Sequence, residues 1–330
     1  MLYLNVKKYQ EKPLADSYPL EQERSLIPRW LNPLPIIGMI SETRYWAYLM
    51  LIPGILLISV VIFYPVISGI RLSFHEYKLL RPNLGQPYVG LDQYVDLFAD
   101  DVFWVSVKNT AIFGVFNVLS PFTLGLITAL ALKRAVRGAS VVRTMILMPW
   151  FMPSVVAGHM WALLLDSRLG VINDILVRLG LLETYHPWFA QPDTAMAAIL
   201  VVGLWRGFPF FALLLLAGLQ TISDELYEAA SVDGANAWHK FRHITIPLLM
   251  PVIVVAITLR TIGVVNSPDL MIILTGGGPG LATHVLSFFA FTTAYASFDF
   301  GYAAAISVVM LLIVMVFTII YLRVSGVDRA

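Results

Sequence analysis

The sequence has no cysteine among its 330 residues, and it is poor in charge. The lack of cysteine excludes disulfides, thiolate nucleophiles and thiolate metal sites, and it leaves the redox compartment open. Only 13% of the residues are charged, whereas 58% are hydrophobic and the mean hydropathy is +0.76. This balance indicates a polytopic membrane protein rather than a soluble globule. The net charge of +1 argues against a nucleic-acid partner, which would require a basic face.

Signatures of nucleotide chemistry are missing as well. The chain has no G-x-x-x-x-G-K-[ST] sequence, and its one glycine run, residues 276–280, carries no lysine. No group of side chains suggests a catalytic centre. We therefore predict a chain that is not an enzyme and that has no catalytic residue, no metal site and no cofactor of its own.

Long apolar stretches divide the rest of the sequence, and each is close to the roughly 20 residues that a helix needs to cross a bilayer. They predict an all-α membrane protein with six transmembrane helices. The expected spans cover residues 46–68, 109–132, 142–165, 195–219, 247–265 and 303–322. Residues 1–45 form a polar N-terminal segment that is partly interfacial, residues 46–323 form the transmembrane domain, and residues 324–330 form a tail.

Basic residues predict the orientation of these spans. Six crossings put both termini on one side, and most Lys and Arg residues fall on that side. The last loop on the opposite side, residues 266–301, contains no Lys or Arg at all. By the positive-inside rule, we expect both termini to be cytoplasmic.

The polar stretch over residues 223–247 is enclosed by two of these apolar runs. Ser223 can cap a short helix whose first turn contains Asp224 and Glu225, which complement the helix dipole. Gly234 permits a turn, and Pro247 is tolerated in the first turn of the next span. We expect a helix, a glycine turn and a second short helix on the cytoplasmic side.

Within that stretch, Glu228-Ala229-Ala230, then Gly234, then Ile244 and Ile246-Pro247 resemble the EAA loop of binding-protein-dependent ABC transporter permeases, with Ile246 where leucine is usual. In that family the first helix docks in a cleft of the ATPase subunit. The resemblance implies that Glu228 meets a basic residue of the ATPase. The implied coupling residues are Glu228, Ala229, Ala230, Asp233, Gly234, Phe241, Ile244 and Pro247.

A second resemblance narrows the family. Thr275-Gly276-Gly277-Gly278-Pro279 is similar to the TGGGP signature of maltose-transporter-type carbohydrate permeases, in particular of the larger permease subunit. The resemblance covers about residues 46–323. It implies a sugar importer with a second EAA-type permease in a heterodimer, an ABC ATPase dimer that binds ATP and Mg, and an extracytoplasmic solute-binding protein. It also implies that the protein lies in the cytoplasmic membrane of a bacterium or archaeon.

Polar side chains at membrane depth are costly and usually face a partner or a solute path. Arg206 and Arg260 are the clearest cases, and Trp205 and Phe210 beside Arg206 offer aromatic faces to a sugar. By the resemblance, further contacts come from the fourth and fifth spans. The expected pathway residues are Trp205, Arg206, Gly207, Phe210, Arg260, Gly263, Val264, Asn266 and Ser267. Asn117 also stands out as an amide within the second span.

Other solutes and other classes of protein stay open at this stage. Gly263 and Val264 stand where an aromatic residue and an amide would help to hold maltose. Arg206 and Arg260 also suit an anionic solute, such as a uronic-acid oligosaccharide or a glycerol phosphate ester. An ion-coupled secondary transporter would need a carboxylate deep in a span, which the sequence lacks. A membrane scaffold would explain the spans but not the order of the EAA residues.

Overall fold

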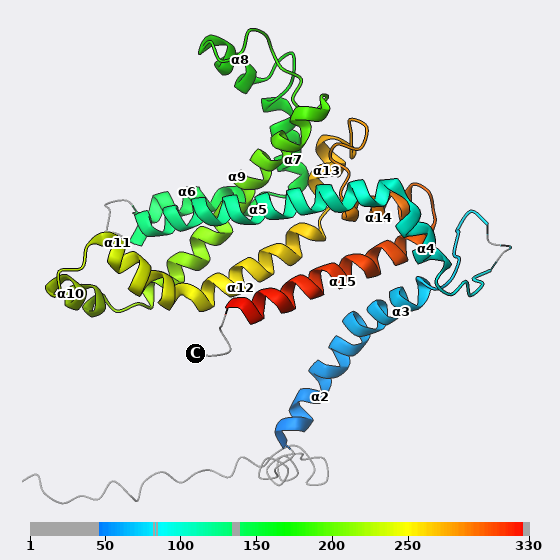
Figure 1. Ribbon diagram of the computed structural model, residues 1–330, viewed down its shortest axis with the longest axis horizontal. Helices are drawn as coiled ribbons and strands as arrows, with labels where there is room; N and C mark the ends of the chain where they lie inside the picture. Colours follow the sequence, from blue (N-terminus) through cyan, green and yellow to red (C-terminus); the bar gives the residue numbers. More distant parts are fainter. Residues whose placement is uncertain (1–45, 82, 84, 134–138, 326–330) are drawn as a thin grey trace, which may run out of the picture. The chain divides into compact units, whose positions relative to one another are not determined.

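The computed structural model describes residues 46–81, 83, 85–133 and 139–325, and all regular elements of this part of the chain are helices (Figure 1). The chain is divided into two compact units, which comprise residues 1–64 and residues 65–330. The polar N-terminal segment over residues 1–45 and most of the tail, residues 326–330, lie outside the described residues. The predictions for those segments and the domain boundaries stay predictions.

The first expected span is a single apolar helix over Tyr48–Leu72. It consists of α2 (Trp46–Ile58), the π-helical turn η1 (Ser59–Phe63) and α3 (Tyr64–Leu72). The unit of residues 1–64 ends at the start of α3. The 25 residues of this helix are enough to cross a bilayer.

The unit of residues 65–330 contains the other long helices. These are α5 (Asp101–Lys133), α9 (Pro192–Gln220), α12 (Ile246–Val265) and α15 (Phe300–Ser325). They confirm the second, fourth, fifth and sixth predicted spans. Helix α5 begins at Asp101 rather than near Asn109, because the Asp100 carboxylate accepts a hydrogen bond of 2.8 Å from the Val102 amide and so starts the helix earlier.

The third predicted span is not one straight helix. It is divided into α6 (Ala139–Phe151) and α7 (Ser154–Leu164), which are bent by 96° at the break. Pro153 directly precedes α7, and a proline both lacks an amide hydrogen and disfavours helical geometry in the residue before it. By length and composition, the described residues provide five helices that can cross a membrane, or six if the bent pair is one span. The all-α polytopic fold is thereby confirmed.

Helices α5 and α9 pack along each other and form the centre of this unit. Phe211, Leu215 and Leu219 of α9 and Leu249 of α12 are fully buried in one apolar cluster between these helices. Figure 1 shows α10 (Asp224–Val232) and α11 (Ala237–Lys240) at one end of the long helices, and α4 (Asp92–Ala99) and α14 (Leu286–Tyr295) at the other. The EAA loop is therefore separated from the loops at the opposite end by the length of the bundle.

The segment between α12 and α15 was expected to be a loop, but it contains two helices, α13 (Asp269–Leu274) and α14. The Asn109 amide of α5 donates hydrogen bonds to the carbonyls of Leu281 (2.7 Å) and His284 (3.0 Å). The Thr110 hydroxyl accepts one of 2.8 Å from the Leu286 amide. The glycine signature thus begins a segment that is fixed to α5.

His284 provides a test of this attachment. Its Nδ1 lies 2.8 Å from the Ser106 hydroxyl oxygen, which itself donates to the Val102 carbonyl, so Nδ1 carries the hydrogen of the neutral ring. Burial lowers the pKa of His284 below its ordinary value of 6.5, although the Asp100 carboxylate raises it in part. Between the lowered and the ordinary pKa, the unfolded chain binds more protons than the folded chain.

Stability from this site should therefore be complete above about pH 6.5 and should fall as the pH drops below that value. We expect the melting temperature of the detergent-solubilised protein to decrease on acidification, and the decrease to be smaller in His284→Gln. A matched scan of His159→Gln serves as the control, because that exposed ring has, among the described residues, a hydrogen bond only to the Val155 carbonyl one turn earlier in its own helix. Equal acid sensitivity of wild type and His284→Gln would contradict the assignment.

Candidate functional site

The EAA loop has the predicted cap and turn, and a second cap that was not predicted. The Ser223 hydroxyl accepts a hydrogen bond of 3.3 Å from the Glu225 amide at the start of α10. Gly234 has a φ of +79°, a conformation that favours glycine because a β-carbon would be strained there. Asn236 caps α11 by accepting a bond of 2.8 Å from the His239 amide. The first helix and the glycine turn are confirmed.

The second half of the loop differs from the expectation of a separate short helix. Helix α11, the π-helical turn η3 (Phe241–Thr245) and α12 join into one helix over Ala237–Val265. Pro247 lies in the first turn of α12, where its missing N–H is tolerated. Because the helix is continuous through η3, α11 is a direct extension of α12.

Helix α10 is attached to two of the long helices. The Tyr227 hydroxyl lies 3.0 Å from the Thr245 hydroxyl in η3. The Lys133 ammonium at the end of α5 lies 3.5 Å from an Asp224 carboxylate oxygen and 4.1 Å from the centre of the Tyr227 ring. No sequence pattern singles out Lys133, Tyr227 or Thr245, because no spacing rule links positions so far apart in the chain.

The predicted coupling residues fall into two groups by exposure. Glu228, Ala229 and Asp233 are exposed, Val232 beside them is 89% exposed, and Trp238 is 63% exposed. Ile244, by contrast, packs against the apolar cluster of α9 and α12. The outward face of α10 is therefore available to another subunit, whereas Ile244 helps to fix the loop on the bundle.

A cavity of about 220 Å³ lies among α5, α6, α9, α12 and the start of α13. It is lined by Phe113, Asn117, Trp150, Gly203, Arg206, Arg260, Gly263, Val264, Ser267, Asp269 and Leu270. Five of the nine predicted pathway residues are in this lining, namely Arg206, Arg260, Gly263, Val264 and Ser267. The fourth and fifth spans thus bring their polar residues to one place, as the sequence suggested.

The other four predicted pathway residues lie outside the lining. Trp205 packs on Trp161 with ring centres 5.6 Å apart, and Phe210 packs on Trp150 at 6.0 Å. Asn266 donates its amide hydrogen to the Ile262 carbonyl within its own helix. Gly207 supports the cavity indirectly: a β-carbon there would lie 2.5 Å from an Arg260 guanidinium nitrogen. The aromatic faces of the cavity come instead from Trp150 and Phe113.

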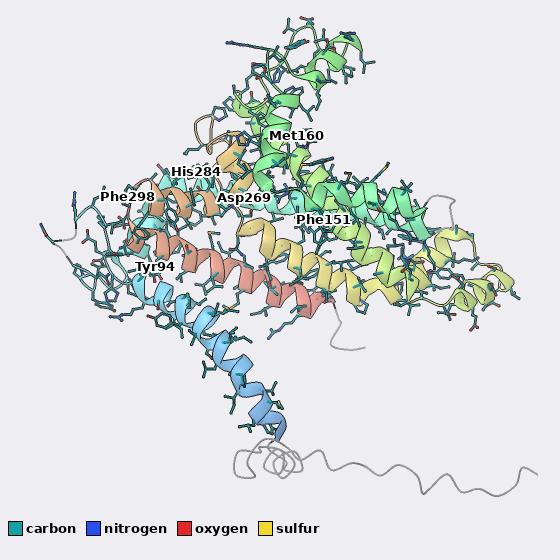
Figure 2. The ribbon with its side chains drawn as sticks, turned by 180° about the vertical axis from the view of Figure 1, so that it is seen from behind. Tyr94, Phe151, Met160, Asp269, His284 and Phe298 are labelled. Carbon is teal, nitrogen blue, oxygen red and sulfur yellow. The ribbon has the colours of Figure 1, made fainter. Side chains whose placement is uncertain are left out.

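The two arginines of the cavity differ in their partners. Arg206 donates a hydrogen bond of 2.7 Å to the Ser154 hydroxyl, which donates one of 2.9 Å to an Asp269 carboxylate oxygen. Asp269 is at the start of α13, just beyond the end of α12 (Figure 2). Arg260 donates only to the Asn117 carbonyl, at 3.4 Å, and no carboxylate among the described residues is within ion-pair distance of it.

This cavity has the chemistry of a site for a polar solute. Guanidinium groups, a carboxylate and a serine hydroxyl can exchange hydrogen bonds with a solute, and the Trp150 and Phe113 rings can contact its apolar faces. Buried polar groups among long apolar helices are typical of a transport path. A helical bundle with such a cavity and an exposed helix–turn–helix at one end is typical of a membrane transporter subunit.

Residues 122–326 match the family described as binding-protein-dependent transport system inner membrane component, and the chain belongs to this family. It is therefore a permease subunit of an ABC importer, and its family is one of inner-membrane proteins that work with a solute-binding protein. Membership of this family excludes the alternative of an ion-coupled secondary transporter.

Characterised relatives agree with the assignment. The chain is 39% identical to the trehalose/maltose transport system permease protein MalF of Thermococcus litoralis over 86% of this chain and 94% of the relative. It is 37% identical to the sulfoquinovosyl glycerol transport system permease protein SmoG of Agrobacterium fabrum, over 90% and 94%. A bacterial ABC transporter involved in the import of the acidic polysaccharide alginate has the same fold, with a TM-score of 0.74, 24% identity and coverage of 88% and 98%.

Proposed function

We propose that this permease imports a sugar or oligosaccharide and that the cavity bounded by Arg206, Arg260 and Trp150 is part of its path. The single observation that carries the proposal is this polar cavity, because it lies on the helices joined to the EAA loop. The relatives that transport trehalose, maltose and sulfoquinovosyl glycerol support a carbohydrate solute.

In this proposal, ATP and Mg are bound by the partner ATPase dimer, and the outward face of α10 docks on that dimer through Glu228. Closure of the dimer displaces α10. Tyr227, which lies beside Thr245, and Lys133, which lies beside Asp224, pass the displacement to α12 and α5. These helices carry Arg260 and Asn117, so the cavity is opened alternately to the outside and to the cytoplasm.

A second, different permease completes the path in this account, and the termini and the EAA loop are cytoplasmic. Gly263 is consistent with a shared path, because a β-carbon added there would meet no atom of the described residues within 4 Å beyond its own helical turn. The chain itself needs no cofactor in this scheme.

An anionic solute is a second candidate. Arg206 is linked to Asp269 through Ser154, whereas Arg260 has no carboxylate partner among the described residues, so the cavity carries excess positive charge. One relative transports sulfoquinovosyl glycerol, which is a sulfonated solute.

If the solute is anionic, Arg260→Gln should reduce uptake of an acidic sugar by about tenfold or more, because a charge-assisted bond to a guanidinium is worth roughly 1.5–3 kcal/mol. Uptake of a neutral sugar should change much less. Competing uptake of labelled glucuronate-containing and neutral disaccharides by membrane vesicles measures the difference. Equal losses for both solutes would rule out the anionic candidate.

Purification of the tagged chain from native membranes in mild detergent tests the assembly. We expect an ATPase with a Walker motif and a second EAA-bearing permease to copurify and to be identified by mass. Recovery of the chain alone or as a homodimer, from membranes in which the same detergent preserves other ABC complexes, would contradict the proposed heterodimer.

A further inference from the structure

Asn117 is an unusual member of the cavity lining. It lies on α5, only 1% of its surface is exposed, and neither atom of its side-chain amide has a hydrogen-bond partner among the described residues. On the same helix, Asn109 is also buried, but its amide nitrogen donates to two carbonyls. Burial on α5 therefore does not by itself explain why the Asn117 amide has no partner.

The neighbouring helix is shaped around this amide. Gly203 of α9 faces Asn117, and a β-carbon at Gly203 would overlap the amide oxygen and crowd the nitrogen. Gly203 also lines the cavity. The absence of a side chain at this position thus leaves room for an amide that makes no bond within the chain.

A buried amide that has lost water and has gained no partner is unfavourable, so such groups call for a compensating role. The amide offers two N–H donors and one acceptor oxygen. Arg206 and Arg260 can only donate, so they cannot accept the proton of a solute hydroxyl. A pair of adjacent hydroxyls matches the amide, because one O–H donates to Oδ1 while the other oxygen accepts from Nδ2.

We infer that Asn117 is a solute-binding residue that holds adjacent hydroxyls of a polyhydroxylated solute in this cavity, and that Gly203 positions its amide. The inference rests on the proposed function of the cavity as the solute path. It adds α5 to α9 and α12 as a helix that selects the solute, and it assigns that selection to hydroxyl groups rather than to charge.

The test uses the complete transporter in proteoliposomes, with maltose, trehalose and their singly deoxygenated analogues as probes. For an imported sugar, Asn117→Ala should raise KM by roughly tenfold or more, as expected for a site built to bond a hydroxyl. The variant should also lose discrimination against the analogue that lacks the hydroxyl bound by Asn117, and keep discrimination against the others. Its melting temperature should not fall, because the substitution removes an unsatisfied buried group.

Two further variants separate binding from structure. Gly203→Ala should displace the amide and reproduce the higher KM. The double variant that combines Gly203→Ala with Asn117→Ala should have a KM no higher than that of Asn117→Ala, since the new methyl group occupies the space that the amide has vacated. Ser120→Ala, on the same helix, is the control with an unchanged KM, because the Ser120 hydroxyl bonds to the Phe116 carbonyl and lies outside the lining.

Unchanged KM and unchanged discrimination in Asn117→Ala, for a sugar that the wild type imports, would overturn the inference while leaving the proposed function intact. Failure of the wild-type complex to import any of the probes or the glucuronate-containing disaccharide would contradict the proposed function itself, and the inference would fall with it. The wild-type measurement therefore distinguishes the two failures.

Discussion

Replacement of Glu228 by arginine is expected to abolish uptake while the permease stays folded. Glu228 is exposed on α10 and makes no ion pair within the described residues, so the fold does not depend on its charge. In the proposed docking it meets a basic residue of the ATPase. Reversal of its charge places two like charges together, which costs several kcal/mol at an interface. Uptake should therefore fall by about a hundredfold or more, since each 1.4 kcal/mol is a factor of ten.

The measurement is ATP-driven uptake, combined with recovery of the ATPase on the tagged permease. Glu183→Arg is the matched control, because Glu183 is also exposed but lies far outside the EAA loop. Glu228→Gln, which removes the charge without reversing it, should give an intermediate loss. Full ATPase recovery and normal uptake in Glu228→Arg would show that α10 does not dock through this residue.

Replacement of Gly125 by leucine is expected to prevent stable packing of the bundle. Gly125 of α5 packs directly against the backbone of α9, and its β-carbon would be 2.9 Å from the Phe208 carbonyl oxygen and the Ala212 nitrogen. These are backbone atoms, which cannot move aside as a flexible side chain can. Small residues permit such close approach of membrane helices. Overpacking of this kind costs about 1–3 kcal/mol and more where backbone must shift.

Thermal unfolding in detergent and the yield of monodisperse protein measure this effect. Even Gly125→Ala should lower the melting temperature clearly. Gly114→Ala on the same helix is the control, because its added β-carbon would lie 3.9 Å from Val265 in ordinary contact. Equal stability of the two alanine variants would contradict the close packing of α5 on α9.

The long helices could be predicted from the sequence because a bilayer crossing has a length and a composition that are readable along the chain. The bend at Pro153 was harder to predict from the sequence. Proline is tolerated within other long helices here, at Pro121 and Pro209, so the residue alone does not indicate a break. The helices of the segment after α12 were missed because α13 and α14 are too short to be recognised as spans.

The candidate site was predictable only in part, for a physical reason. Motif resemblance pointed to α9 and α12, and charge at membrane depth identified Arg206 and Arg260. Which side chain faces the cavity depends on helix rotation, and this decides that Gly263 lines it whereas Trp205 and Phe210 pack elsewhere. Ser154 joins Arg206 to Asp269 only because the break before α7 brings it there, so the pairing follows from tertiary structure.

In the proposed function, this chain forms the sugar path of an ATP-driven, binding-protein-dependent importer. Transport can be tested directly by accumulation of labelled trehalose or maltose in proteoliposomes that contain the purified complex, with ATP supplied on the side of the ATPase and the solute-binding protein on the other. We expect accumulation that requires both ATP and the binding protein. Accumulation driven by an ion gradient without ATP, or equal uptake in the absence of the binding protein, would contradict it.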